Sequence, residues 1–261
     1  MDLGLDDHTA IVTASSSGLG KASASALARE GTNVVICGRT PDRLESAAEE
    51  IREDATGEVV PVETDITSAT DIQTLVEATV HEFGGVDHLV TSAGGVPSGP
   101  YGDITEEEWY EAYDMLVMSV QRAITETRPY LEESEAGTIT AITSTSVAEP
   151  IEGLVLSNAV RRGVIGLIKT VSRELAPEIR ANAVLPGPHE TPRIEELIEA
   201  AVDRGDVASY EAGRTEWAEP IPLERIGDPI ELGDVIAFLA SERASFVNGV
   251  GLPVDGGRLR G

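Results

Sequence analysis

The sequence of 261 residues is poor in cysteine and in hydrophobic runs, and each shortage excludes a class of protein. Cys37 is the only cysteine, which excludes a framework of disulfides and a zinc site built on cysteine ligands. No apolar run approaches the roughly 18 residues that a membrane-spanning helix needs. The segment MDLGLDDH lacks the basic and apolar regions of a signal peptide. We therefore expect a cytoplasmic protein that does not act in a membrane.

Positive charge is also scarce. The chain has 19 Lys and Arg against 46 Asp and Glu, for a formal net charge of -27, and only Lys21 and Lys169 are lysines. This balance leaves no basic footprint for nucleic acid, so nucleic acid is not expected as a partner. The acidic residues are spread along the chain, and we interpret them as an adaptation to high intracellular salt, which screens self-repulsion. An ordinary acidic protein is the alternative interpretation.

What the chain does have is an alternation of short apolar runs with helical patterns. The runs are typical of parallel strands buried on both faces: Thr9–Thr13, Asn33–Cys37, Val59–Glu63, His88–Thr91, Thr138–Ile142, Ala181–Leu185 and Val250–Val254. The segments between them carry apolar residues at helical spacing: Leu19–Glu30, Asp42–Asp54, Asp71–Phe83, Ser157–Leu175 and Ile230–Ala240.

This alternation predicts an α/β fold. We expect a single-domain Rossmann fold over residues 1–261, with a doubly wound parallel sheet of about seven strands and helices on both faces. The segment Glu190–Pro222 interrupts the alternation with a short amphipathic stretch and then polar sequence. A long connection of this kind predicts a substrate lid at about 190–222, with a plain surface excursion as the alternative.

A glycine-containing turn follows the first predicted strand. Its residues form a candidate site for the phosphates of a dinucleotide, because the glycines admit a ligand and the helix N-terminus attracts an anion: Ser15, Ser16, Ser17, Gly18, Leu19 and Gly20. The second strand ends in Gly38 and Arg39, with no acid at the position that would bind a ribose 2′-hydroxyl. Arg39 suits a 2′-phosphate, which favours NADP, with NAD possible. A surface ion pair of Arg39 is the alternative.

Several motifs together make the chain resemble the short-chain dehydrogenase/reductase family from about Leu5 to Gly257, and in particular its 3-oxoacyl-carrier-protein reductases. Thr13–Gly20 is similar to the family's TGxxxGIG turn, with Ala14 in place of the first glycine. The segment Asn182–Gly187, followed by Thr191, resembles the family's NxVxPGxxxT stretch. Val254–Gly257 resembles its C-terminal block. The resemblance implies an oxidoreductase that moves a hydride between a nicotinamide and a carbonyl or alcohol.

The resemblance also assigns cofactor-binding residues beyond the glycine turn. Asp65 and Ile66 follow the third strand, and Ser92, Ala93 and Gly94 stand where the family has the end of its NNAG motif. Pro186, Gly187 and Thr191 match the stretch beside the nicotinamide.

The family's catalytic Asn, Ser, Tyr and Lys are largely replaced. Ser144 matches the serine, but the asparagine position falls on Leu116, and Ser157 and Arg161 stand where the family has Tyr and Lys. A serine hydroxyl is a far weaker acid than a tyrosine, so Ser157 cannot simply replace it. Arg161 remains able to donate to the ribose hydroxyls.

These replacements leave three hypotheses open. In the first, the protein is a working NADP(H)-dependent reductase or dehydrogenase with a substituted acid or base. His189 is the first candidate, because its ordinary pKa suits the task, although a histidine fixed by backbone contacts is an equal alternative. Tyr101 and Glu149 are weaker candidates. In the second, the fold binds dinucleotide without turnover, as a sensor or partner subunit. In the third, the chemistry needs little acid catalysis.

Substrate and assembly are only broadly predicted. We expect a small hydroxy or keto compound, held by Gly95–Tyr101, Val147–Leu156 and Thr191–Pro222, and no metal, because the four histidines show no paired ligand spacing. Nearby acids would discourage a polyanionic substrate unless salt screens them. The resemblance implies a homotetramer or homodimer.

Overall fold

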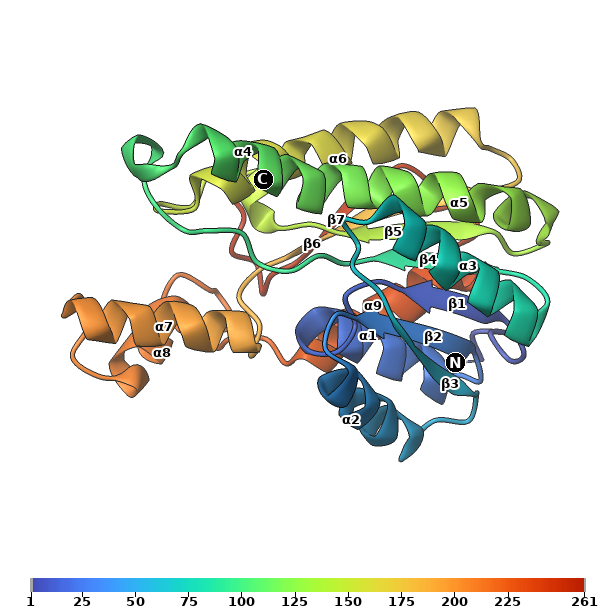
Figure 1. Ribbon diagram of the computed structural model, residues 1–261. Coiled ribbons are helices and arrows are strands. Elements are labelled where there is room, and N and C mark those ends of the chain that lie inside the picture. Colours follow the sequence, from blue (N-terminus) through green and yellow to red (C-terminus); the bar gives the residue numbers. More distant parts are fainter. Residues whose placement is uncertain (1, 261) are drawn as a thin grey trace.

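The computed structural model describes residues 2–260, which form one sheet of seven parallel strands (Figure 1). The strands are β1 (Thr9–Val12), β2 (Asn33–Gly38), β3 (Val59–Glu63), β4 (His88–Thr91), β5 (Thr138–Ile142), β6 (Arg180–Pro186) and β7 (Gly251–Val254). Their order in the sheet is β3-β2-β1-β4-β5-β6-β7. Each predicted strand is present with its ends within one residue of the expected ones, and the predicted fold class is confirmed.

Helices cover both faces of the sheet (Figure 1). One face carries α1 (Gly18–Arg29), α2 (Pro41–Arg52) and α9 (Pro229–Ala240). The other carries α3 (Ala69–Phe83), α5 (Ser119–Glu133) and α6 (Val155–Glu174). A short helix α4 (Glu106–Tyr113) leads into α5 through a π-helical turn at Asp114–Met118.

Two hydrophobic cores hold these layers together. Because successive side chains of a strand point to opposite faces, β1 sends Ile11 into the core beneath α3, α5 and α6, and Val12 into the core beneath α1, α2 and α9. Leu89 and Val90 of β4 divide in the same way. The apolar runs in the sequence are continuous because both faces of each strand are buried.

The order of the strands in the sheet reverses once, between β1 and β4. The chain turns one way after β1, to β2 and β3, and the other way from β4 to β7. In open α/β sheets, ligands bind outside the carboxyl ends of the strands at the point where the order reverses. The reversal between β1 and β4 therefore positions the candidate site.

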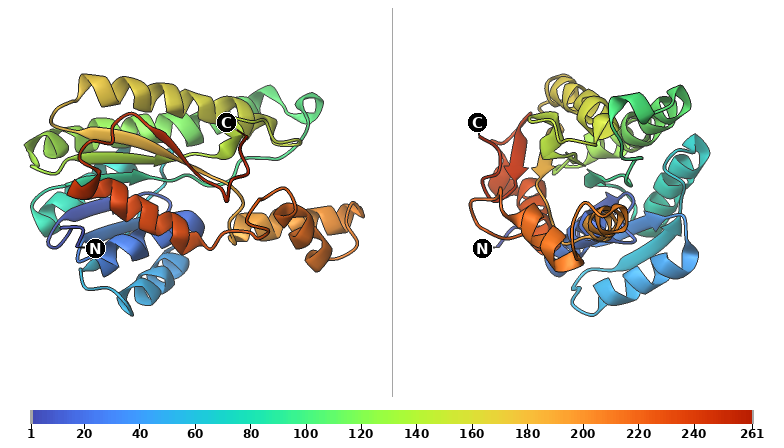
Figure 2. Two further views of the ribbon diagram at one scale, coloured as in Figure 1. Left: turned by 180° about the vertical axis from the view of Figure 1, so that it is seen from behind. Right: turned by 90° about the vertical axis from the view of Figure 1, so that its left-hand side faces the viewer.

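The segment at 190–222 is helical. It forms α7 (Pro192–Arg204) and α8 (Tyr210–Ala218), which project from the carboxyl edge of the sheet (Figure 2). The two helices pack closely, since a Cβ at Gly213 of α8 would lie 2.7 Å from Ile198 Cγ2 of α7. The sequence predicted no helix in this segment: its short amphipathic stretch lies in α7, and the polar sequence after it contains α8.

Candidate functional site

The turn after β1 has the backbone of a phosphate-binding turn. Gly18 adopts a left-handed conformation with φ of +57°, and a Cβ at Gly20 would lie 2.6 Å from the Ala14 carbonyl oxygen. Ala14 keeps a left-handed φ of +46°, although it stands where the family has glycine. The turn therefore retains its shape despite the replacement, at a strain of about 1–2 kcal/mol.

The helix after this turn begins without a cap. Ser17 precedes α1 but its side chain accepts no hydrogen bond from the first turn, and that turn contains no acidic residue. Its free N–H groups and the positive end of the helix dipole suit a bound anion. The start of α6, at Val155, likewise carries no acid in its first turn.

Thr13 ties the glycine turn to the segment after β4. Its hydroxyl donates to the Ser92 carbonyl oxygen at 2.7 Å and accepts from the Ser92 amide at 2.9 Å. The two segments on either side of the sheet's reversal are therefore held in a fixed relation.

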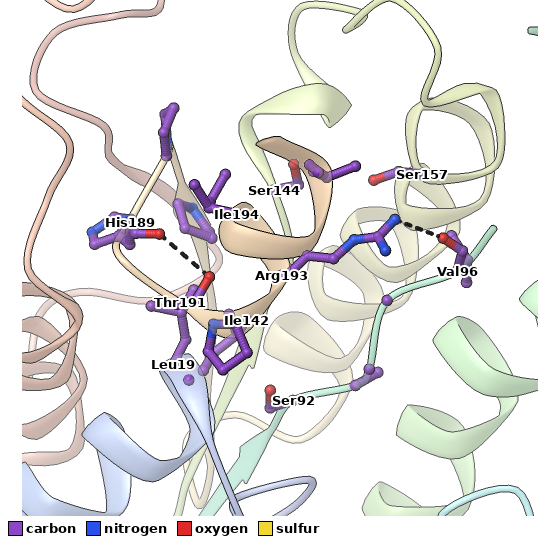
Figure 3. A pocket seen from close by; sticks show the side chains of 18 of the residues that line it. Leu19, Ser92, Val96, Ile142, Ser144, Ser157, His189, Thr191, Arg193 and Ile194 are labelled. Carbon is purple, nitrogen blue, oxygen red and sulfur yellow. Dashed lines mark hydrogen bonds between the residues drawn. The ribbon is translucent and has the colours of Figure 1, made fainter. Parts of the chain in front are cut away.

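A cleft of about 340 Å³ opens at this edge (Figure 3). It brings together fourteen of the residues that the sequence assigned to the site: Ser17, Gly18, Leu19, Gly20, Ser92, Ala93, Gly94, Ser144, Ser157, Arg161, Pro186, Gly187, His189 and Thr191. The expected substrate-lining segments contribute Gly95, Val96, Pro97, Ile151, Leu154 and the start of α7. Tyr101 and Glu149 are exposed and do not line it.

Five assigned residues lie outside the lining of this cleft: Ser15, Ser16, Arg39, Asp65 and Ile66. The Ser15 hydroxyl is buried, donates to the Val12 carbonyl oxygen at 2.6 Å and accepts from the Cys37 amide at 2.9 Å. It therefore joins the turn to β2 and does not face a ligand. Ile66 is buried in the core.

Arg39 and Asp65 lie near one another beside the end of β2. Arg39 is exposed, and the Asp65 carboxylate accepts two hydrogen bonds from Thr67, at 2.9 and 2.7 Å. These bonds lower the pKa of Asp65, and the charge of Arg39 lowers it further. A ligand that extends past Gly38 toward β3 would meet these two residues.

Two serines of the catalytic region are linked through a third. Ser144 precedes a single helical turn, where its hydroxyl accepts from the Ser146 amide at 3.1 Å. The buried Ser146 hydroxyl lies 3.1 Å from that of Ser157. Ser146 had no signal in the sequence beyond its place two residues after Ser144. Both Ser144 and Ser157 line the cleft, so their hydroxyls are available to a substrate oxygen.

Arg161 lies one helical turn beyond Ser157 on α6. Its half-buried guanidinium has no hydrogen-bonding partner within residues 2–260. Burial, followed by the charge of Arg193, lowers the pKa of Arg161 to about 10, so it remains charged at neutral pH. Leu116, at the family's asparagine position, is buried in the core and offers no polar group.

His189 is enclosed by backbone. Its Nδ1 lies 2.9 Å from the Gly187 carbonyl oxygen, and a Cβ at Gly227 would lie 2.8 Å from its Cδ2. Burial lowers the pKa of His189. Figure 3 shows its ring turned away from Ser144 and Ser157. These contacts fit the histidine fixed by its backbone surroundings better than an acid or base for a substrate near the serines.

The sequence assigned no individual role to three arginines of the cleft, although Arg193 lies within the expected substrate-lining segment Thr191–Pro222. Arg43, Arg193 and Arg258 all line the cleft, and Arg258 lies 5.8 Å from the ring centroid of Trp217 in α8. Each stands close to a motif named above: Arg43 four residues after Arg39, Arg193 two residues after Thr191, and Arg258 directly after Gly257. In a chain so poor in basic residues, that proximity was a usable signal.

The site fits a dinucleotide. The uncapped start of α1, the left-handed Gly18 and the close contact at Gly20 leave a cradle that side chains do not fill. Arg43 adds a cation beside this cradle. Within residues 2–260 no three His, Cys, Asp or Glu side chains group as metal ligands, and none of the helices is long and apolar enough to cross a membrane.

Comparisons with known proteins agree with this geometry. The family described as Enoyl-(Acyl carrier protein) reductase matches residues 13–258. The 3-oxoacyl-acyl-carrier-protein reductase FabG of Thermotoga maritima is 33% identical over 254 residues, which are 97% of this chain and 98% of that protein. A putative ketoacyl reductase of the monensin polyketide synthase in Streptomyces virginiae is 34% identical and covers 96% of each chain.

Solved structures are similar over the same span. L-sorbose reductase from Gluconobacter frateurii, complexed with NADPH and L-sorbose, superposes with a TM-score of 0.94 at 29% identity over 100% of both chains. A variant of actinorhodin polyketide ketoreductase with NADPH gives a TM-score of 0.91 at 30% identity over 96% of this chain and 97% of that one. The chain belongs to the short-chain dehydrogenase/reductase family of oxidoreductases.

Proposed function

We propose that this protein is an NADPH-dependent reductase of small carbonyl compounds, which also oxidises the corresponding alcohols. One observation carries the proposal: a single cleft joins the phosphate-binding turn, the Pro186–Thr191 stretch, and the Ser144, Ser157 and Arg161 side chains. NADPH in the complexes of the sorbose reductase and the polyketide ketoreductase supports the choice of cofactor.

The cofactor's phosphates would be held by the turn at Ser17–Gly20 and the free amides of α1. Arg39 and Arg43 would bind a 2′-phosphate, and Asp65 the adenine side. Arg161 would donate to the ribose hydroxyls. Bound NADPH supplies the hydride that reduces the carbonyl carbon.

The protein's own residues act on the carbonyl oxygen. Ser144 and Ser157 donate hydrogen bonds to it, and Ser146 orients Ser157. The fixed charge of Arg161 stabilises the negative charge that develops on this oxygen, as preorganised donors do in other enzymes. A water molecule that remains in the cleft beneath the lid donates the proton to this oxygen, in place of the missing tyrosine.

The helices α7 and α8 serve as the substrate lid. Thr191, Arg193, Ile194 and Leu197 from the start of α7, and Trp217 from α8, line the cleft and would shield the substrate from bulk water.

We also propose that the protein works as a homotetramer or homodimer in a cytoplasm of high salt. Apolar positions on α5 and α6 permit the assembly. None of the Asp and Glu side chains within residues 2–260 is buried, so the acidic excess faces solvent, where salt screens it.

Calorimetric titration with NADPH and NADH in molar KCl tests the cofactor, and reduction of a panel of ketones, followed by NADPH absorbance, tests the reaction. We expect tighter binding of NADPH than NADH, and about a 10–100-fold lower kcat/KM in Ser144→Ala, since a donor to the reacting oxygen is lost. Activity that survives in Ser144→Ala would overturn the role of Ser144. Tight NADPH binding without hydride transfer to any ketone would instead indicate a dinucleotide-binding sensor.

A further inference from the structure

The lining of the cleft has a charge opposite to that of the whole chain. Its ionised side chains within the described residues are four arginines and a single acid, Glu196, whereas the chain carries a formal charge of -27. Arg43 lies beside the cofactor's phosphate turn. The other three, Arg161, Arg193 and Arg258, lie with the serines and the lid.

Arg193 reaches across the cleft from the start of α7 (Figure 3). Its Nη2 donates to the Val96 carbonyl oxygen at 3.0 Å, and its Nη1 lies 3.3 Å from the exposed Glu196 carboxylate. An exposed ion pair of this kind is weak. Most of the hydrogen-bonding capacity of the Arg193 fork therefore remains available for a ligand.

The neighbouring cations are also incompletely paired. The charge of Arg193 lowers the pKa of Arg161, so the two like charges repel each other, and none of the ion pairs within residues 2–260 involves Arg161. The Arg258 Nη1 is buried and has no hydrogen-bonding partner within residues 2–260. Arranging cations in this way is unfavourable unless an anion joins them.

We propose that the substrate carries a carboxylate and that Arg193 is its counter-ion, with Arg258 as a second cation at the lid side. The inference rests on the proposed reductase function and names its substrate class as oxo acids. An arginine fork matches the two oxygens of a carboxylate, and such a charge-assisted pair positions the neighbouring carbonyl near Ser144 and Ser157.

Two other roles for Arg193 have distinct consequences. As a mere latch between α7 and the loop at Val96, it would affect charged and neutral substrates alike. As a ligand of the cofactor's phosphates, it would affect the affinity for NADPH. The experiment separates these cases.

The experiment uses matched ketones that differ only in charge: pyruvate, 2-oxobutanoate and acetoacetate against their methyl esters. Reduction is followed by NADPH absorbance, and the Kd of NADPH by calorimetry, in wild type, Arg193→Gln and Arg193→Lys. Arg204→Gln is the matched control, because it removes the same charge from the exposed far end of α7. Binding of each ketone to the protein saturated with NADP⁺ is measured as well.

We expect the acids to be preferred over the esters by about 10–100-fold in kcat/KM, the range of a hydrogen bond to a charged group. Arg193→Gln should lower kcat/KM for the acids about 10–100-fold more than for the esters with the Kd of NADPH unchanged, Arg193→Lys should restore part of the preference, and Arg204→Gln should keep it. Equal loss for acid and ester, weaker NADPH binding in Arg193→Gln, or esters turned over or bound as well as acids would each overturn the proposal. Failure of the reductase function itself is distinguishable, because NADPH would then fail to bind or to reduce ketones of either charge.

Discussion

The outer surface and the cleft of this protein carry opposite charge. Acidic side chains crowd the surface, and those within residues 2–260 all remain at least partly exposed. The cleft instead collects four of the chain's arginines. The charges on the surface interact with solvent and salt, whereas the charges in the cleft interact with a bound ligand. The net charge of a protein therefore says little about what its binding site prefers.

The same division appears at the helix starts. Six helices have an acid in their first turn, as the helix dipole favours. The helices α1, α5 and α6 have none, and α1 and α6 begin at the cleft. A chain with 46 acidic residues thus keeps them out of the first turns of α1 and α6, although α7, which also begins at the cleft, has Glu195 in its first turn.

The largest effect should come from removing the cleft's central charge. Arg161→Gln should lower kcat/KM for ketone reduction by about 10²–10³-fold, because the developing charge on the oxygen loses its cation. Arg162→Gln, the exposed neighbour on the same helix, removes an equal charge from the surface and should leave the rate unchanged. Steady-state kinetics measure both, and similar losses in the two variants would contradict a specific role for Arg161.

The surface should respond to salt. Raising KCl from 0.1 to 2 M should increase the Tm by about 5 °C or more, corresponding to roughly 2 kcal/mol for a domain of this size, because screening relieves repulsion among carboxylates. Potassium glutamate should act like KCl if screening is the cause. Thermal melts that do not change with salt would exclude adaptation to high salt.

The imidazole of His88 is buried, so the pH dependence of stability measures the cost of a buried charge that no ligand stabilises. Burial and the neighbouring His8 lower the pKa of His88 to about 3. The unfolded chain binds a proton below pH 6.5 while the folded protein does not, so stability is lost as the pH falls from 6.5 toward 3. At pH 5 the loss should be about 2 kcal/mol.

Urea unfolding of wild type and His88→Gln between pH 7.5 and 5 measures this loss. The variant should show a flatter pH dependence, whereas His81→Gln, at an exposed position of α3, should keep the wild-type slope. Equal slopes in all three proteins would contradict the assignment.

The smallest change in stability should come from replacing Ala14, which lines the cleft. Ala14→Gly should raise the free energy of unfolding by up to about 1 kcal/mol, because glycine adopts the left-handed φ at that position without strain. Ala200→Gly, inside α7, should instead lower it by about 1 kcal/mol. Urea unfolding of both variants gives the two values, and destabilisation by Ala14→Gly would show that Ala14 is not strained.

The fold could be predicted because it depends on local patterns. The strand at Val59–Glu63 was predicted to the residue, since a short apolar run between turn residues has few alternatives. The helix α8 could not, because Gly213 is its one buried residue and its sequence is mostly polar.

The sequence predicts those parts of the site that lie in recognisable motifs, but not the parts that come together only when the chain folds. The sequence placed Ser144, Ser157 and Arg161 in one cleft, as the structure does. It included Arg193 only as one residue of the expected substrate-lining segment Thr191–Pro222, and it did not place Arg258, which is about 65 residues further along the chain. The orientation of the His189 ring likewise depends on Gly227, which is distant in sequence.

The open start of α1 has a consequence for the lifetime of the protein. Until an anion binds there, the first-turn amides of α1 lack side-chain partners, and the empty protein is less stable than the loaded one. A ligand at 100 times its Kd adds about 2.7 kcal/mol, which lowers the unfolded fraction about a hundredfold. Because NADP⁺ carries the same phosphates as NADPH, proteases that act on unfolded chains would remove the protein faster only when both forms are scarce, so its abundance would follow the total amount of the cofactor.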